Sequence, residues 1–226
     1  MVHPDLLQRI DLFWELSETE LESLSQSAMI RHYRGGEIIS SAATLDRDFR
    51  LVLSGRVKLS RTSPEGREQI LFIFGPGEPF CLASSFQQQP LPGTVTALEE
   101  SGILAVPGPA LEVMVRAHPS LLFNIMGVMA RRLKNAMQLI ETLALKDVPQ
   151  RVAAFLVHSS TMDCSRGDRE TFELCITQRE MAKSLGTTPE TLSRSIRKLE
   201  QEGLLEAAGR TIRILDRDGL QRLAAS

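Results

Sequence analysis

The stretch 186-GTTPETLSRSIRKLEQEG-203 has the features of a short amphipathic helix with a defined start and end. Thr188 can serve as the N-cap, and Pro189 then takes the first helical position, where a missing N–H costs nothing. Leu192, Ile196 and Leu199 follow at spacings of four and three residues, which places them on one buried face. The opposite face is polar and charged, and it carries Glu190, Ser193, Arg194 and Arg197. Such a face predicts contact with a charged partner.

A second helix is predicted directly before this one. Thr177 can cap it, and Glu180 three residues later completes a capping box. Gly186 ends the helix and begins the turn. Downstream, 204-LLEAAGRTIRIL-215 predicts a β-hairpin that turns at Gly209. Two helices joined by a short glycine-containing turn form a helix-turn-helix, and the hairpin would be its wing.

The residue types on the charged face suit the major groove of double-stranded DNA. Arg194 can donate two hydrogen bonds to guanine, Glu190 can accept one from cytosine, and Ser193 can contact thymine. Residues 178–198 carry five basic and two acidic side chains, although the whole protein has a net charge of −2. The alternative, a solvated charged face, is disfavoured by the capped partner helix and by the wing. The other predicted DNA contacts, which cap the helices or reach phosphates, are Thr177, Gln178, Arg179, Thr188, Thr191, Arg197, Lys198, Arg210 and Thr211.

The N-terminal half predicts short helices followed by a compact set of strands. Short helices are expected within residues 4–28, where Ser17 and Glu20 can form a capping box. Between residues 30 and 106, alternating stretches such as 49-FRLVLSGRVKLSRT-62 are separated by turns such as 63-SPEG-66. Closely spaced strands with glycine-containing turns predict an antiparallel barrel or sandwich.

A long helix is predicted from about residue 120 to residue 146. Its apolar positions alternate at spacings of four and three residues through three heptads, at Leu122, Met126, Met129, Leu133, Ala136, Ile140 and Leu143. This pattern is typical of a parallel dimer seam. The alternative is a two-sided core helix, because a second apolar row could pack on the strands, namely Leu121, Ile125, Val128 and Leu139. Asp147 and Pro149 predict a break and a new helix start, and the polar residues 159–170 predict a loop.

Together these motifs resemble the CRP/FNR family of bacterial transcription regulators over the whole chain. The resemblance is carried by 54-SGRVKL-59, 129-MARRL-133, 143-LALKDVPQRVAAFL-156 and 190-ETLSRSIRKLEQEGLL-205. It implies an α+β fold with an N-terminal double-stranded β-roll of the cyclic-nucleotide-binding type (1–118), a long dimerisation helix (119–146) and a C-terminal winged helix-turn-helix (147–226). The spacing of Glu190, Ser193 and Arg194 is similar to the FNR-type reading helix. That similarity implies a homodimer that reads TTGA-like palindromes.

Family members that bind a cyclic nucleotide hold it in a cassette of the β-roll, and the matching stretch here, 77-GEPFCLASSFQQQPLPGTV-95, departs from that pattern. The carboxylate that holds the ribose is missing around Leu82 and Ala83, and the arginine that pairs with the phosphate is missing around Pro92 and Gly93. Residues 81–95 hold no basic side chain, whereas a buried phosphate requires a charged or multiply donating partner. We therefore expect no cyclic AMP and an apolar effector pocket. Its predicted lining is Phe80, Cys81, Leu82, Phe86, Met126, Met129, Leu133, Ala136 and Met137.

Three further segments, 57-VKLSRTSPEGREQIL-71, 140-IETLALKD-147 and 210-RTIRILDRDGL-220, are similar to the DNR and HcpR branch of the family. That similarity implies a nitrosative-stress regulator whose effector is nitric oxide bound through haem. Haem iron takes His, Met or Cys ligands. No spacing selects among the candidates, which are His3, His32, His118, His158, Met126, Met129 and Cys81. The alternatives left open are another small molecule or the redox state of a cysteine.

The sign of regulation does not follow from the sequence. An activator would also contact RNA polymerase, and 63-SPEGREQ-69 is the candidate loop for that contact. A repressor needs no such contact.

Composition argues against several other functions. Cys81, Cys164 and Cys175 are too few for an iron–sulfur cluster and lack the spacing of a zinc site. They predict reduced thiols in the cytoplasm. The sequence shows no apolar run long enough for a membrane span and no secretion signal. It also lacks a convergent catalytic cluster, a phosphate-binding glycine loop and a nucleophile elbow, so an enzyme is not expected.

Overall fold

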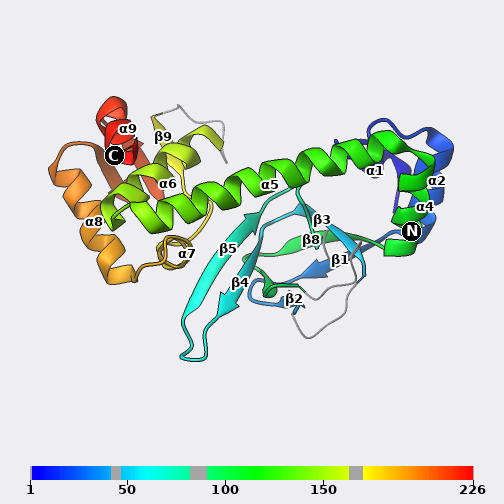
Figure 1. Cartoon of the computed structure of the whole chain (residues 1–226), viewed down its shortest axis with the longest axis horizontal. Coiled ribbons are helices and arrows are strands. Elements are labelled where there is room, and N and C mark those ends of the chain that lie inside the picture. The colour runs from blue at the N-terminus through cyan, green and yellow to red at the C-terminus, as the bar shows by residue number, and fades with distance from the viewer. Residues whose placement is uncertain (1, 42–46, 82–90, 163–169, 226) are drawn as a thin grey trace. The chain divides into compact units, whose positions relative to one another are not determined.

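The computed structural model describes residues 2–41, 47–81, 91–162 and 170–225. The chain divides into two compact units, Met1–Leu133 and Lys134–Ser226. The boundary falls inside the long helix α5 (Pro119–Leu145), so that each unit contains part of this helix (Figure 1).

The N-terminal unit begins with the predicted short helices, α1 (Pro4–Gln8) and α2 (Glu18–Ser27). The predicted capping box is confirmed, because the Ser17 backbone N–H donates to the Glu20 carboxylate at 2.7 Å. Helix α4 (Gly108–Ala117) follows the strands and contacts α2. Such short helices are marginal in isolation, and burial against the strands stabilises them. The buried side chains include Leu7, Phe13, Leu24, Phe49 and Leu111.

The strands form two four-stranded antiparallel sheets, which confirms the predicted β-roll. Their orders are β1-β8-β3-β6 and β2-β7-β4-β5. The strands are β1 (Met29–Tyr33), β2 (Ile38–Ser40), β3 (Phe49–Ser54), β4 (Val57–Thr62), β5 (Glu68–Phe74), β6 (Pro79–Phe80), β7 (Thr94–Ala97) and β8 (Ser101–Val106). Side chains of both sheets share one core, including Val52 and Ile103 from the first and Val57, Phe74 and Val95 from the second.

The turn between β3 and β4 depends on a glycine. Gly55 adopts φ +74°, a conformation that L side chains rarely adopt. A Cβ atom at this position would also lie 2.3 Å from the carbonyl oxygen of Glu100. The close approach of these two backbone segments therefore requires glycine at position 55.

Helix α5 confirms the predicted long helix, and its two apolar rows differ in burial. Leu121 and Ile125, from the second row, are buried in the N-terminal core. The heptad row faces solvent in the single chain: Leu122, Met126, Met129, Leu133 and Ile140 are exposed, and Ala136 and Leu143 are half-buried. An exposed apolar row of this kind is typical of a surface that a partner covers.

No single described helix is long and apolar enough to cross a membrane. Helices α4 and α5 reach the length and apolar composition of a membrane span only when taken together, and the chain bends by 116° between them.

The C-terminal unit confirms the predicted winged helix-turn-helix. Its elements are α6 (Val148–Met162), β9 (Thr171–Glu173), α7 (Gln178–Ser184), α8 (Pro189–Gln201), β10 (Leu205–Ala208), β11 (Thr211–Ile214) and α9 (Arg217–Ala225). The wing is a three-stranded sheet of order β10-β11-β9, in which β9 was not predicted.

Helix α6 also extends four residues into the predicted loop, so the prediction that the loop begins at residue 159 is wrong. The buried Ser160 hydroxyl donates to the Val157 carbonyl at 2.8 Å and accepts from Arg217 at 3.2 Å. These contacts hold a polar last turn in helical form. Residues 163–169 of the predicted loop lie outside the described residues.

The cysteines differ from the expectation of three reduced thiols. Cys175 is disulfide-bonded. Cys81 is buried and takes part in no disulfide. Spacing in the sequence does not reveal the distance between two cysteines in the fold, and that distance decides whether they can be bridged.

The predicted break between α5 and α6 is confirmed, and hydrogen bonds fix it within the C-terminal unit. The backbone N–H groups of Asp147 and Gln150 each bond the other residue's side chain, at 2.7 and 3.0 Å. The Arg151 guanidinium donates to the Lys146 carbonyl at 2.9 Å and to the Leu185 carbonyl at 2.9 Å. The last turn of α5 is therefore tied to the end of α7.

Candidate nucleic-acid interface

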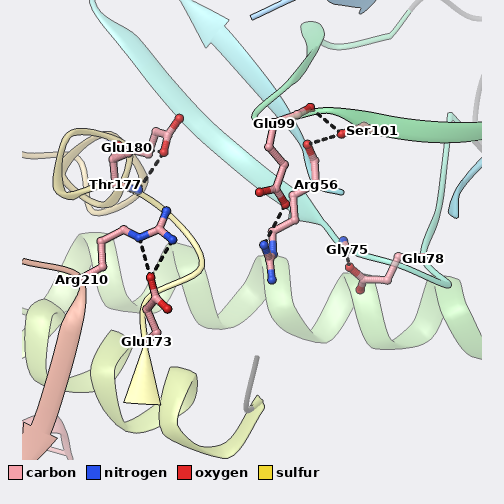
Figure 2. Close-up of polar contacts among 9 residues, drawn as sticks. All are labelled: Arg56, Gly75, Glu78, Glu99, Ser101, Glu173, Thr177, Glu180 and Arg210. Carbon is pink, nitrogen blue, oxygen red and sulfur yellow. Dashed lines mark hydrogen bonds and ion pairs between the residues drawn. The ribbon is translucent and has the colours of Figure 1, made fainter. Parts of the chain in front are cut away.

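The first helix of the predicted DNA-binding motif, α7, begins at a complete capping box (Figure 2). The Thr177 hydroxyl accepts from the Glu180 backbone N–H at 3.2 Å, and the Glu180 carboxylate accepts from the Thr177 backbone N–H at 2.9 Å. The turn that follows contains Gly186 at φ +61°. In this turn the Thr187 N–H donates to the Ala182 carbonyl at 3.0 Å. These bonds set the position at which α8 starts.

The second helix, α8, buries one face and presents the other to solvent, as predicted. Leu192, Ile196 and Leu199 are buried in the C-terminal unit. The Thr188 hydroxyl accepts from the Thr191 N–H at 3.3 Å, which confirms Thr188 as the N-cap. On the opposite face, Glu190, Arg194, Arg197 and Lys198 are exposed, and Thr191 and Ser193 are half-buried.

The charged side chains at the start of α8 are exposed and interact with their neighbours on the helix. A hydrogen bond from its own backbone N–H, and then one from the Thr188 hydroxyl, lower the pKa of Glu190, and the Arg194 charge adds to this effect. Glu190 is therefore an ionised acceptor at neutral pH. The Arg194 guanidinium donates to the Thr191 hydroxyl at 3.2 Å, which leaves its other donors available to a ligand.

The wing tip is held by an ion pair that sequence reasoning missed. The Arg210 guanidinium donates two hydrogen bonds to one Glu173 carboxylate oxygen, at 3.0 and 2.7 Å (Figure 2). Arg210 was predicted to reach phosphate, and here its charge is partly neutralised by Glu173. The two residues lie 37 positions apart, so no local pattern could have paired them. Thr211, beside Arg210, is exposed.

The structure brings the start of α7 to the wing. The Gln178 side chain donates to the Gly209 carbonyl at 3.4 Å. Gln178 and its neighbour Arg179 are exposed, as are Thr177 and Thr188. All of the predicted DNA contacts therefore lie on the C-terminal unit, on α7, α8 and the wing.

The predicted effector residues differ in burial. Phe80 and Cys81 are buried in the core of the β-roll. Cys81 adopts φ +63°, which is uncommon for a residue with a side chain. Leu82 and Phe86 lie outside the described residues. Of the predicted effector residues on α5, Met126, Met129, Leu133 and Met137 are exposed in the single chain, and Ala136 is half-buried.

The candidate iron ligands do not converge among the described residues, where no group of three or more His, Cys, Asp or Glu side chains could hold a metal. His3, His32 and His158 are exposed. His118 is half-buried and contacts the Glu20 carboxylate through Nε2. Cys81 is the candidate that the structure buries in the β-roll.

Sequence reasoning also missed a cation beside this core. The Arg132 guanidinium from α5 lies 4.9 Å from the centroid of the Phe74 ring. Burial lowers the pKa of Arg132, and the charges of Glu78 and Cys81 partly offset that effect. The stretch 81–95 lacks a basic residue, but α5 supplies one from more than thirty residues away. The prediction of an apolar effector pocket therefore stays a prediction, with Arg132 as a charged neighbour of Phe74.

Comparisons with known proteins agree with this architecture. The model of the Crp-like helix-turn-helix domain matches residues 150–223, and that of the cyclic nucleotide-binding domain matches residues 30–118. The chain is 32% identical to the transcriptional activator protein FnrA of Stutzerimonas stutzeri, over 85% of this chain and 76% of FnrA. It is 26% identical to a CRP-like cAMP-activated global transcriptional regulator of Mycobacterium tuberculosis, over 97% and 99% of the two chains. A solved structure of a CooA mutant from Carboxydothermus hydrogenoformans superposes with a TM-score of 0.78 at 26% identity, covering 93% of this chain and 91% of that one.

Proposed function

Because the chain belongs to the CRP/FNR family of transcription regulators, we propose that it acts as a homodimer that binds TTGA-like palindromes under the control of an effector in its β-roll. Family membership makes it a DNA-binding regulator with an effector-binding domain and not an enzyme. The DNA target sequence and the identity of the effector go beyond family membership and are argued separately below.

The exposed face of α8 supports the proposed DNA target sequence. Glu190 and Arg194 lie four residues apart, so they share one helical face with Ser193 between them. An ionised carboxylate, a hydroxyl and a guanidinium can contact cytosine, thymine and guanine in successive base pairs of the major groove. The matching residues of α7 and the wing would contact phosphates and fix the register.

The exposed heptad row of α5 supports the proposed homodimer. Five large apolar side chains on one helix face would be buried by the same face of a second copy. A two-fold axis along this seam would present two α8 helices, and the DNA site would then be a palindrome with half-sites one helical turn apart. The Arg151 guanidinium joins the carbonyl of Lys146, directly after α5, to that of Leu185, directly after α7, and we propose that a change in the seam reaches the helix-turn-helix through these bonds.

The effector proposal follows the similarity to the DNR and HcpR branch: nitric oxide bound through haem, in a nitrosative-stress response. Among the described residues Cys81 fits an iron ligand best, because it is buried in an apolar wall with Phe74 and Phe80. When bound, haem would supply an iron that takes up nitric oxide. Another small molecule and cysteine redox chemistry remain the rival effectors, and Cys81 is the residue that the redox rival would use.

If the protein is an activator, we propose that it contacts RNA polymerase through the exposed hairpin tip between β4 and β5. The tip is an ordered turn, because the Ser63 N–H donates to the Arg67 carbonyl at 2.8 Å and the Gly66 N–H donates to the Ser63 carbonyl at 2.9 Å.

The DNA proposal is tested by titrating the purified dimer into a labelled duplex with a TTGA palindrome and into a scrambled duplex of the same composition. A specific regulator binds its own site about a thousandfold or more tighter than other DNA at the same salt concentration. Equal affinity for the two duplexes would overturn the proposed sequence.

The effector proposal is tested by titrating haemin while recording the absorption spectrum, followed by nitric oxide without oxygen. A saturable Soret shift near one haem per subunit that nitric oxide alters, and that Cys81→Ser changes, would support it. Absorption that rises without saturation would reject haem and direct the search to other effectors.

A further inference from the structure

Two threonine hydroxyls connect the start of α8 to its proposed base-reading arginine. The Thr188 hydroxyl accepts from the Thr191 backbone N–H at 3.3 Å and donates to the Thr191 hydroxyl at 3.2 Å. The Thr191 hydroxyl in turn accepts from the Arg194 guanidinium at 3.2 Å. The three residues follow one another at intervals of three positions, so their side chains are neighbours on the helix surface. Together they form a continuous chain of hydrogen bonds from the N-cap to the guanidinium.

The threonines in this chain are themselves restricted. Thr188 is fixed to the backbone, because its hydroxyl supplies the N-cap of α8. Thr191 is half-buried, and its branched Cβ limits the rotation of its side chain. An exposed arginine without such a contact would sample many rotamers. The Thr191 hydroxyl therefore restricts Arg194, a side chain that is exposed to solvent.

The bond to Thr191 leaves Arg194 able to read a base. A guanidinium has five N–H donors, and the bond to Thr191 uses one of them. The remaining donors are sufficient for the two bonds that guanine O6 and N7 accept. Ordering a mobile side chain on binding lowers affinity, and a side chain that is already held avoids part of that loss. The contact with Thr191 can therefore persist on DNA and favour binding.

We propose that Thr191 is a positioning residue for base recognition, and that its hydroxyl holds Arg194 in the orientation that reads guanine. This inference rests on the proposed binding of a TTGA palindrome by α8. It differs from the phosphate contact that the sequence suggested for Thr191, because a phosphate contact would act independently of Arg194. The two roles therefore predict different results when both residues are changed.

The test is a double-mutant cycle on the full-length dimer, with the labelled TTGA palindrome at one fixed salt concentration. Thr191→Val removes the hydroxyl, keeps the shape of the side chain and retains the backbone N–H that bonds the cap. We expect it to raise the dissociation constant about 4- to 100-fold, from about 2- to 10-fold for ordering one side chain in each subunit. In an Arg194→Ala background, Thr191→Val should change the dissociation constant by less than about twofold.

Two matched variants separate positioning from folding. Thr191→Ser restores the hydroxyl and should bind the palindrome within about threefold of the wild type. Thr187→Val removes a hydroxyl from a half-buried neighbour in the preceding turn and should leave the affinity unchanged. Thermal melting of every variant reports any loss of fold, which would lower the affinity in both the wild-type and the Arg194→Ala background.

A measurement on the free dimer tests the positioning without DNA. The order parameter of the Arg194 Nε–H bond, from nitrogen-15 relaxation, should be lower in Thr191→Val than in the wild type. The order parameter of the corresponding bond in Arg197, which is exposed one turn further along α8, should be the same in both proteins.

Three results would overturn the assignment: an equal effect of Thr191→Val in the wild-type and Arg194→Ala backgrounds, a Thr191→Ser variant as weak as Thr191→Val, or an unchanged order parameter for Arg194. The scrambled duplex is titrated with the same preparations. If the Arg194 order parameter responds as expected but wild-type protein binds both duplexes equally, the proposed DNA function is rejected, and the contact by which Thr191 holds Arg194 is not.

Discussion

Replacing Arg194 by Ala tests the proposed reading of guanine by α8. In the free protein this side chain is exposed, and it donates a hydrogen bond of 3.2 Å to the Thr191 hydroxyl. Removing an exposed side chain of this kind changes the free energy of unfolding by at most about 0.5 kcal/mol. The variant should therefore fold and dimerise like the wild type, and any loss of DNA affinity reports on the interface.

The loss expected on DNA is large because each dimer carries two copies of α8. A bidentate contact between arginine and guanine is worth about 1–3 kcal/mol, so the two half-sites together lose about 2–6 kcal/mol. At 25 °C this corresponds to a dissociation constant raised by about 30-fold at least, and by about 10⁴-fold at most.

The assay is fluorescence anisotropy with a labelled TTGA palindrome and with the same duplex containing 7-deazaguanine, which lacks the N7 acceptor. Wild-type protein should bind the modified duplex more weakly, whereas Arg194→Ala should bind the two duplexes alike. Arg197→Ala serves as the control, because loss of one phosphate contact in each subunit weakens binding to both duplexes equally and lowers the salt slope by about two. If Arg194→Ala stays within about twofold of the wild type, or still responds to 7-deazaguanine, the assignment of Arg194 to guanine is incorrect.

Three further variants follow from particular contacts. Ile140→Lys places a charge on the exposed seam of α5 and should raise the dimer dissociation constant about 100-fold or more, because the two copies lose apolar burial. Glu141→Lys, which changes an exposed residue beside the seam, should leave that constant unchanged. Sedimentation equilibrium measures both constants. Glu173→Gln releases Arg210 at both wing tips of the dimer, and should tighten DNA binding and increase the salt slope by up to about two. An unchanged slope would mean that Arg210 does not contact phosphate. Gly55→Ala introduces a Cβ atom 2.3 Å from a carbonyl oxygen and should cost more than about 2 kcal/mol in urea unfolding; a cost below about 0.5 kcal/mol would mean that this turn relaxes.

The winged helix-turn-helix could be predicted from sequence because its signals are local. The capping box of Thr177 and Glu180 spans four residues, and Thr188 caps a helix that begins at the next position. Gly209 likewise predicts the wing turn, because glycine readily adopts the positive φ that this turn has. The heptad row of α5 is also local, since it repeats along one helix.

The features that sequence reasoning missed depend on contacts between distant residues. Arg132 approaches Phe74 across 58 positions, and the composition of the cassette alone gave no sign of it. Arg210 is paired with Glu173 by the three-stranded wing, whose outer strand is short and has no strong pattern. Ser160 extends α6 because tertiary burial satisfies its hydroxyl, although its sequence neighbourhood is typical of a loop. Local propensity could not have predicted these pairings, because tertiary contacts override it.

The most direct test of the central claim, a two-fold dimer that reads a palindrome, is the mass of the complex on two duplexes of equal length. One duplex carries the TTGA palindrome, and the other carries a single half-site with the second half scrambled. Mass photometry at a fixed salt concentration should find two chains on the palindrome at all occupancies. On the half-site duplex it should find the same dimer, bound more weakly. Single chains that fill the two half-sites independently, with the same affinity on both duplexes, would contradict the account.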